Sequence, residues 1–447
     1  MKRLLPIVVA LIACKDEQLP PTGQVLLYVT TDAVLPPPPD ADGPSGVFDR
    51  LSIEIFPPGE TIPCVGCARE VGIDSLMVDE GRASMGWIPP AGLAGVRARV
   101  RLYRTRGAFV VGPRKESTLE SVVELPAVAA DGIIEVTVDL LTDNLTKPQG
   151  TLDAPSQPVS GKPPRGHVGT WQADRRRPCS GANDGEVCVP GGAYWLGEPT
   201  VAQISIDEKH GLERLVAVSP FIVDATETTV KQFRASGIAD TVGPGRRQAD
   251  EMCTYTDNPV NDEKKPVNCL SREQAIAFCM KKGMRLPREG EWEWMASALG
   301  RYDKYPWGTD LPGCSDAAFG RNNPPATKPA LPPSDSACSP PAGAVDVGVS
   351  LRDRVTIDGR TIFDLLGNVS EWLEDSYQDE WESCFTAPIM LDPVCKTPSV
   401  NKPRRSLRGS NFLAGVEYVD LKIRESYDDT PDARPHSAGV RCVRDSE

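Results

Sequence analysis

The sequence predicts two folded domains: an N-terminal all-β sandwich and a C-terminal domain that mixes strands and helices. At 447 residues the chain is longer than one hydrophobic core usually supports. Its first third contains short segments in which apolar and polar residues alternate, the pattern of strands that bury one face. From about Cys179 the pattern changes, and apolar runs are followed by segments with helix-start signals.

Residues 24–141 are predicted to form the sandwich. The strand-like segments end at Pro, Gly and Asp turns and span 24–31, 48–56, 96–103 and 132–140. Strict alternation places Arg97, Arg99 and Arg101 on one face, which we interpret as solvated; a ligand-binding strip is the alternative. The sequence of this domain shows no catalytic constellation.

Residues 142–178 are predicted to be an extended interdomain linker, because they are rich in Pro, Gly, Lys and Arg and have no apolar periodicity. The second domain then spans 179–447. Thr228 or Thr229 is the expected N-cap of one helix, and Ser271, with Gln three residues later, forms a capping box at the next.

Residues 1–13 predict a lipoprotein signal peptide. Lys2 and Arg3 precede an apolar run, 4–13, that is too short to span a bilayer. The run ends in Leu-Ile-Ala-Cys, which resembles a bacterial lipobox, so Cys14 is the predicted site of acylation. An ordinary secretory peptide cut nearby is the alternative. Residues 14–23 would be a polar tether holding the protein on a membrane of the cell envelope, with the outer membrane favoured and the body in the periplasm or at the surface.

Charge and histidine content limit the classes of function. The formal net charge of −13 argues against nucleic-acid binding, because phosphate contacts need a basic face. The chain has three histidines, widely spaced, so a multi-histidine metal centre is nearly excluded.

Cysteine usage agrees with export. Of the 13 cysteines, Cys14 is assigned to lipidation, and the other twelve form an even set suited to disulfides. Cys64 and Cys67 have the spacing of a redox or zinc site, but the chain has no second such pair. A local disulfide is the preferred interpretation, and a redox-active thiol pair is the alternative.

The segment at 363–372 carries the clearest site signal. Its apolar residues indicate a buried position, where a carboxylate needs a partner. Asp364 and Glu371 flank a Gly-Asn turn, so two carboxylates and backbone carbonyls predict a hard-cation site, with calcium as the best match. The alternative is that an arginine satisfies Glu371 and that Asp364 caps the turn.

The end of this segment, Gly-Asn-Val-Ser-Glu-Trp at 367–372, is one of a series of blocks that occur in a fixed order. The others lie at 188–197, 216–229, 266–279, 285–296, 305–308, 407–412 and 438–442. The series resembles the formylglycine-generating enzyme (sulfatase-modifying factor) superfamily, and an ordered series is far more specific than one motif.

The resemblance implies an α+β fold similar to that of C-type lectins, with long irregular loops on a modest core. It implies that calcium is held by Asp364, the carbonyls of Gly367 and Val369, and Glu371. Asp316 would belong to a second cation site of the family.

The resemblance also maps a structural disulfide of the family onto Cys279 and Cys442. Proximity in the sequence suggests four further pairs: Cys179–Cys188, Cys253–Cys269, Cys314–Cys338 and Cys384–Cys395.

Formylglycine-generating enzymes oxidise a substrate cysteine with oxygen, using a copper-holding cysteine pair that follows an Arg-Gly-Gly-Ser block. Here the alignment places that pair at Ala414 and Val419, while Asn411 replaces the block's serine and Ser370 a family tryptophan. The pocket defined by Asn411, Ala414 and Val419 thus has no thiolate, and copper is not expected.

We therefore expect a non-catalytic, calcium-stabilised binding module whose partner is a peptide, a glycan or an envelope protein. An oxidase with an altered centre, acting on a substrate cysteine, is the alternative.

Overall fold

The computed structural model describes most of the chain in several stretches. These are residues 23–41, 45–105, 113–197, 213–240, 252–259, 261–321, 338, 343–378, 384–397, 403–430 and 432–446. The predicted signal peptide and all of the predicted tether except Gly23 lie outside them, as does Cys14. Within these stretches, no helix combines the length and the apolar character needed to cross a membrane.

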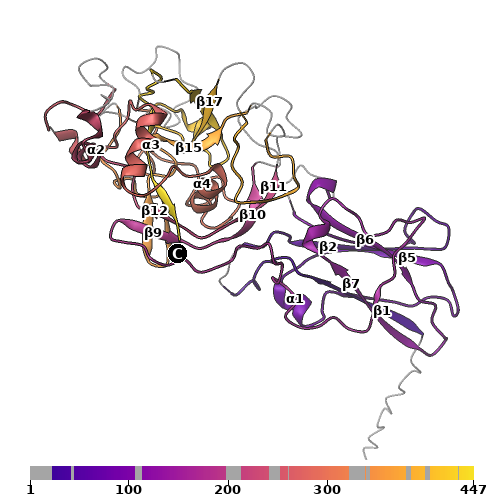
Figure 1. The fold of residues 1–447 in the computed structure, drawn as a ribbon. Helices are drawn as coiled ribbons and strands as arrows, with labels where there is room; N and C mark the ends of the chain where they lie inside the picture. Colours follow the sequence, from indigo (N-terminus) through magenta and orange to yellow (C-terminus); the bar gives the residue numbers. More distant parts are fainter. Residues whose placement is uncertain are drawn as a thin grey trace, which may run out of the picture.

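The first domain consists of two four-stranded sheets that face each other across one core (Figure 1). One sheet has the strand order β4-β1-β7-β8 and the other β3-β2-β5-β6. The strands are β1 Gln24–Thr31, β2 Arg50–Phe56, β3 Ala68–Gly72, β4 Ser84–Trp87, β5 Val96–Tyr103, β6 Thr118–Leu125, β7 Ile133–Leu140 and β8 Val159–Ser160, with the short helix α1 at Ser75–Asp79. Each sheet turns its apolar face inward, as alternation requires.

The arginines of β5 do not share one environment. Arg99 and Arg101 both pair with Glu54 on the outer face, at 2.8 Å and 3.3 Å. Arg97 is buried instead, and its guanidinium donates to the carbonyls of Pro57, Glu60 and Leu152. The expected solvated face therefore ends before Arg97, because a loop folds over it.

The stretch predicted as a linker is extended and lies against the first domain. The backbone of Gln149 pairs with β6, and Ser156 hydrogen-bonds to Val122. Trp171 is buried and donates its indole N–H to Asp143, 2.8 Å away. The backbone pairings lie along the edge of β6 that β5 does not occupy, so this stretch protects an edge strand of the sheet.

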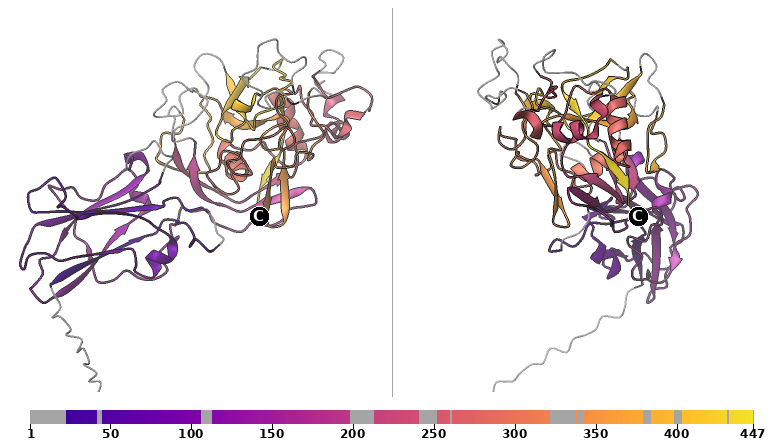
Figure 2. Two further views of the ribbon diagram at one scale, coloured as in Figure 1. Left: turned by 180° about the vertical axis from the view of Figure 1, so that it is seen from behind. Right: turned by 60° about the vertical axis from the view of Figure 1, so that its left-hand side comes forward.

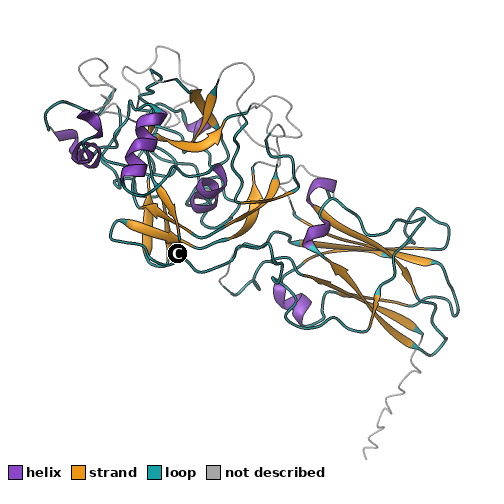
Figure 3. Ribbon diagram, viewed as in Figure 1, coloured by secondary structure: helices purple, strands orange, loops and turns teal. Residues whose placement is uncertain are grey.

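In the described residues, the second domain combines small sheets with three α-helices and short 3-10 turns (Figure 3). The strand orders are β10-β11-β16, β20-β12-β9, β13-β14 and β18-β17-β15-β19. The strands are β9 Glu186–Val189, β10 Gly192–Leu196, β11 Arg214–Val218, β12 Phe221–Asp224, β13 Arg354–Ile357, β14 Arg360–Phe363, β15 Ser370–Ser376, β16 Ile389–Leu391, β17 Arg404–Arg408, β18 Glu425–Asp428, β19 Ala438–Gly439 and β20 Val443–Asp445. The helices are α2 Val230–Ser236, α3 Arg272–Lys281 and α4 Glu289–Ala296.

The helix starts follow the sequence signals. Thr229 caps α2 and forms a capping box with Gln232, and Ser271 forms one with Gln274 at α3. Of the two threonines expected at α2, the second is the cap.

The two domains meet at one end of the first domain's sheets (Figure 2). Trp195 of β10 packs edge-on against Phe48 and donates its indole N–H to the carbonyl of Val47, 2.6 Å away. At the end of β5, Arg104 pairs with Glu213 and stacks over the ring of Tyr302. Side chains of β10 and β11 thus belong to the core of the first domain.

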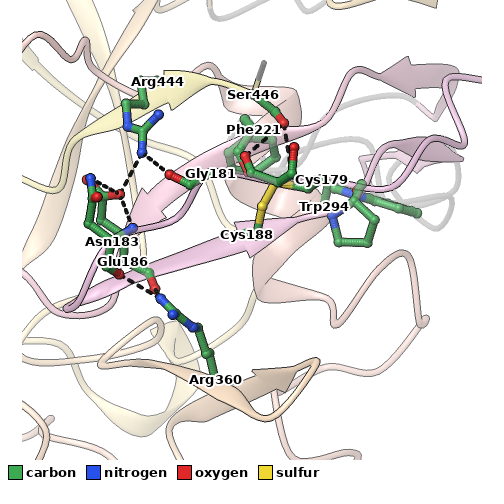
Figure 4. Close-up of a disulfide and its surroundings, with 12 residues drawn as sticks. Cys179, Gly181, Asn183, Glu186, Cys188, Phe221, Trp294, Arg360, Arg444 and Ser446 are labelled. Atoms are coloured by element: carbon green, nitrogen blue, oxygen red, sulfur yellow. Dashed lines mark hydrogen bonds and ion pairs between the residues drawn. A yellow bond between two sulfur atoms is a disulfide. The ribbon is translucent and has the colours of Figure 1, made fainter.

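Six disulfides join the described cysteines, and their pairing agrees with the sequence expectation. They are Cys64–Cys67, Cys179–Cys188, Cys253–Cys269, Cys279–Cys442, Cys314–Cys338 and Cys384–Cys395. Figure 4 shows the second of these, beside a turn that Arg444 and Arg360 hold by hydrogen bonds to Gly181, Asn183 and Glu186. The chain's entry into the second domain is therefore fixed to the last strand, β20.

Candidate functional site

The predicted site segment is a buried turn between β14 and β15. Asp364 and Asn368 both have positive φ, 55° and 62°. Between them, Gly367 packs so closely on Ala318 that an added Cβ would lie 2.9 Å from its backbone atoms. Only glycine fits there. The close approach fixes the direction of the carbonyls and side chains of the turn.

Glu371 has two partners in the core. Its Oε1 accepts a hydrogen bond from Nε of Arg441, 2.7 Å away, and its Oε2 accepts one from the indole N–H of Trp292, 2.8 Å away. Arg441 also donates to the carbonyls of Asp224, Phe363 and Asp364. An arginine thus satisfies Glu371, as the alternative interpretation of the sequence expected.

Asp364 is satisfied only in part. Its Oδ2 accepts a hydrogen bond from the N–H of Gly348. Its Oδ1 is buried and has no hydrogen-bond partner among the described residues. A buried carboxylate oxygen without a donor is costly, and a cation would remove that cost. Oδ1 of Asp364 therefore suits the predicted role of this residue as a calcium ligand.

Two further carboxylates reach the same turn from distant parts of the chain. Glu227, just before α2, accepts hydrogen bonds from the side chain of Asn368 and the N–H of Val369, at 2.7 Å and 3.0 Å. Asp353, just before β13, accepts from the N–H groups of residues 365 and 366. We call Glu227, Asp353, Asp364, Glu371 and Arg441 the charge-excess cluster.

The charge-excess cluster brings four buried carboxylates together with one arginine. Burial raises the pKa of all four, and repulsion from Asp364 adds to the rise for Glu227, Asp353 and Glu371. The pKa of Asp353 rises to about 8. Such a group must take up protons or a cation, because three negative charges would otherwise stay buried without compensation.

The side chains do not form a preformed all-acidic cage. Within the described residues, no group of three or more His, Cys, Asp or Glu side chains is arranged to hold a metal ion. The predicted calcium site uses only two carboxylate side chains, and backbone carbonyls would supply the other two ligands. Asp316, the predicted member of a second site, lies 3.7 Å from Arg352 and accepts a hydrogen bond from the N–H of Gly313.

The pocket positions lie on the segment after β17. Asn411 donates its amide N–H to Oγ of Ser370, 3.1 Å away, and Ser370 in turn donates toward Glu425 at 2.9 Å. Ala414 is partly buried, and Val419 is buried in the core of the second domain. A polar Ser-Asn-Glu cluster therefore holds the side chain of Asn411, whereas Val419 lies among apolar side chains.

None of the described cysteines supplies a free thiol there. All twelve are paired in the six disulfides, and the nearest in sequence, Cys395 and Cys442, are bonded to Cys384 and Cys279. A thiolate is the form that attacks sulfur or binds copper. The described residues therefore do not fit a copper centre of the oxidase type.

Comparison with known proteins decides the family. The sulfatase-modifying factor enzyme 1-like domain matches residues 172–446, more than half of the chain. The chain belongs to this family. The resemblance predicted from the ordered blocks is thereby confirmed.

Relatives of this sulfatase-modifying factor-like chain include active and inactive members by name. The formylglycine-generating enzyme of Thermomonospora curvata is 25% identical over 301 residues, covering 58% of this chain and 93% of that protein. The inactive C-alpha-formylglycine-generating enzyme 2 of Mus musculus is 25% identical over 295 residues, covering 58% and 84%. Among solved structures, Treponema denticola variable protein 1 is similar with a TM-score of 0.40 and 18% identity, covering 58% of this chain and 94% of that chain.

Sequence reasoning missed two carboxylates of the cluster, Glu227 and Asp353, and did not name Arg441 as the arginine beside Glu371. Glu227 stands in the block at 216–229, where its position between two threonines marks a helix start and no ligand pattern. Asp353 follows an ordinary Leu-Arg pair and precedes a strand. They lie 126 residues apart in sequence, and only the fold brings both to the turn.

Proposed function

We propose that this protein is a lipid-anchored cell-envelope protein whose C-terminal domain is a non-catalytic binding module stabilised by calcium. The observation that carries the proposal is the chemistry at two positions. Ala414 and Val419 stand where an oxidase of this family needs cysteines, and the described cysteines are all held in disulfides. Without a thiolate the oxidation has no nucleophile and no copper ligand. The mouse relative is named inactive, which supports the view that proteins of this family can keep the domain without the activity.

Calcium is the cation that suits the charge-excess cluster. Asp364, the carbonyls of Gly367 and Val369, and Glu371 would hold it, since oxygen ligands of mixed type are what calcium takes. Oδ1 of Asp364 would gain its missing partner. Bound calcium would supply positive charge and no chemistry, and Arg441 would go on orienting Glu371.

The remaining parts of the proposal concern architecture and place. Cys14 would carry the lipid, residues 14–23 would be the tether, and the β-sandwich at 24–141 would act as a spacer. Residues 179–447 would have the C-type-lectin-like arrangement, with its ligand a peptide, a glycan or an envelope protein. The supports are the lipobox-like sequence and the ordered blocks.

The deciding experiment measures oxidation directly. Purified protein is denatured and titrated for thiols, then titrated with copper(I), and its oxygen uptake is followed with a peptide bearing a sulfatase-type cysteine motif. The Thermomonospora curvata enzyme serves as the positive control. We expect no free thiol, because the sulfur of Cys14 would carry the lipid, and neither stoichiometric copper binding nor turnover. Turnover of the peptide would instead establish an oxidase with an altered centre.

A second experiment tests the anchor. Acylation needs the thiol of Cys14, so a labelled fatty acid should be incorporated into the wild type and not into Cys14→Ser. Equal labelling of the variant would contradict lipid anchoring at Cys14.

A ligand can then be sought with and without calcium. Residues 14–447 are applied to arrays of glycans and of envelope-derived peptides in the presence of calcium and of a chelator. A bound class whose signal disappears with the chelator would name the ligand chemistry. Equal binding signals with calcium and with the chelator would show that ligand binding does not depend on the cation.

A further inference from the structure

One end of the first domain is apolar and nearly free of charge. Three loops form it: 57–67 between β2 and β3, 88–95 between β4 and β5, and 126–132 between β6 and β7. Glu60 and Asp131 are the only charged residues in these loops, although 25% of the chain is charged. Surface loops normally carry polar side chains, so this composition calls for an explanation.

The three loops are neighbours. The N–H of Gly92 donates to the carbonyl of Val128, 3.0 Å away, which joins the second loop to the third. Gly95 lies against Pro58 of the first loop. Ile133 pairs with the first residue of β1, and Ile88 follows β4 on the other side of that residue. The loops therefore form one surface.

Large apolar side chains protrude from this surface. Ile62 is 74% exposed, Val65 104%, Ile88 61% and Ile133 51%. Single exposed apolar residues are common, but three on adjoining loops and a fourth at the start of β7, all at one end of a domain, indicate a surface that is covered in use.

The most exposed of these residues is held rigidly. The Cys64–Cys67 disulfide closes the turn that carries Val65, and the N–H of Cys67 also donates to the carbonyl of Cys64. Beneath it, the buried Arg97 binds the carbonyls of Pro57 and Glu60. The cysteine pair, which in sequence resembled a redox or zinc site, thus presents an apolar side chain in a fixed position.

The predicted anchor joins the domain at this same end. Gly23, the first described residue, donates its N–H to the carbonyl of Ala130 in the third loop, 2.8 Å away. Only residues 15–22 separate it from Cys14, and eight residues span at most about 28 Å. A lipid attached at Cys14 therefore keeps this end of the domain close to a membrane surface.

We propose that the apolar end, made of loops 57–67, 88–95 and 126–132, inserts into the lipid surface to which Cys14 is anchored. The proposal goes beyond the binding-module function and shares with it only the position of the anchor. The loops contain no Lys or Arg, so insertion depends on apolar burial and not on anionic headgroups.

Insertion would orient the molecule. The strands β1, β5 and β7 have eight residues each and run between this end and the domain junction, a length of about 26 Å. The second domain lies at the junction, where Arg104 meets Glu213. A tether alone would let the body swing, whereas an inserted end holds the second domain away from the lipid.

The first test measures lipid binding without the anchor. Residues 14–447 with Cys14→Ser, which include every described residue, are sedimented with phosphatidylcholine vesicles at low and high salt. We expect binding that is insensitive to salt. The double variant Ile62→Ser with Val65→Ser should reduce the partition coefficient about tenfold or more, as loss of two inserted aliphatic side chains requires.

Matched controls separate insertion from general stickiness. Met280→Ser and Leu311→Ser remove side chains that are 68% and 78% exposed but belong to the second domain. They should leave partitioning unchanged. Equal losses from the control variants, or no vesicle binding by the Cys14→Ser chain, would overturn the proposal.

The second test uses the acylated full chain in vesicles. An environment-sensitive dye on Ile88→Cys should shift to the blue and be quenched by lipid-borne quenchers, while the same dye on Met280→Cys should not. A dye shift that occurs without lipid and increases with protein concentration would show that copies of the chain cover the surface. That result would contradict insertion. Fatty-acid labelling of the wild type and Cys14→Ser reports on the anchor separately, so failure of either proposal is recognisable.

Discussion

The second domain contains two buried groups of charged side chains, and their negative charge is compensated in different ways. In the first, Glu289 and Glu293 lie among three cations, Arg408, Lys422 and Arg424, and the buried Asp375 accepts a hydrogen bond from the N–H of Glu289. We call this the balanced cluster. In the charge-excess cluster, four carboxylates lie beside one buried arginine, Arg441. Both are built from buried acids, so the number of cations is what separates them.

The pKa directions follow that difference. Burial opposes ionisation of Glu293, but Lys422 and Arg408 outweigh it and lower its pKa. In the charge-excess cluster, Arg441 does not outweigh burial and mutual repulsion, and the pKa of each carboxylate rises. The protein compensates Glu293 with its own cations, whereas the charge-excess cluster requires protons or an added cation.

The largest expected effect comes from breaking the balanced cluster. Arg408→Leu leaves Glu289 and Glu293 buried beside fewer cations, which should lower the free energy of unfolding by about 3–5 kcal/mol. Denaturant unfolding measures the loss, and calcium should not restore it. Rescue by calcium would mean that the balanced cluster also binds the cation.

The next effect is calcium binding at the charge-excess cluster. Calcium at one hundred times its dissociation constant should stabilise the wild type by about 2.7 kcal/mol. Glu371→Ala should be less stable and should lose this response, because it removes a ligand and the partner of Arg441.

The control for this prediction lies in the other cluster. Glu293→Gln keeps the shape of a buried acid outside the proposed site, so its melting temperature should rise with calcium as in the wild type. If calcium raises the melting temperature of Glu371→Ala as much as that of the wild type, the cation binds elsewhere.

The smallest effect is a pH dependence inside the balanced cluster. Burial and the neighbouring Glu289 raise the pKa of Asp375 from its ordinary value of 3.8 to about 7. Between those values the folded chain binds more protons at Asp375 than the unfolded chain, so stability falls as pH rises through this range. Asp375→Asn should be less stable at low pH, because one of two backbone hydrogen bonds is lost.

The same variant should also flatten the pH dependence. Melting temperatures of the wild type and Asp375→Asn are compared at pH 5 and pH 8, with the difference between the two proteins as the readout. If the melting temperature of the wild type falls between pH 5 and pH 8 by the same amount as that of the variant, Asp375 does not titrate in this range.

Features set by neighbouring residues were predictable. The limits of β1 and β5, the caps Thr229 and Ser271 and the Cys64–Cys67 pair follow from spacings of eight residues or fewer. The family resemblance also predicted the Cys279–Cys442 disulfide, whose cysteines lie far apart in the sequence. Expectations failed where a distant segment intervened, as when the loop after β2 buried Arg97.

The sequence by itself determined the family, the order of the elements and the lack of cysteines at Ala414 and Val419, because these depend on residue identity and short-range pattern. Only the tertiary structure decided that Glu227 and Asp353 join Asp364 and Glu371 beside the buried Arg441, and that three loops with few charged residues share one end of the first domain. Charge compensation and exposed apolar area are properties of side chains that meet across long stretches of chain. They exist only after folding has brought those stretches together.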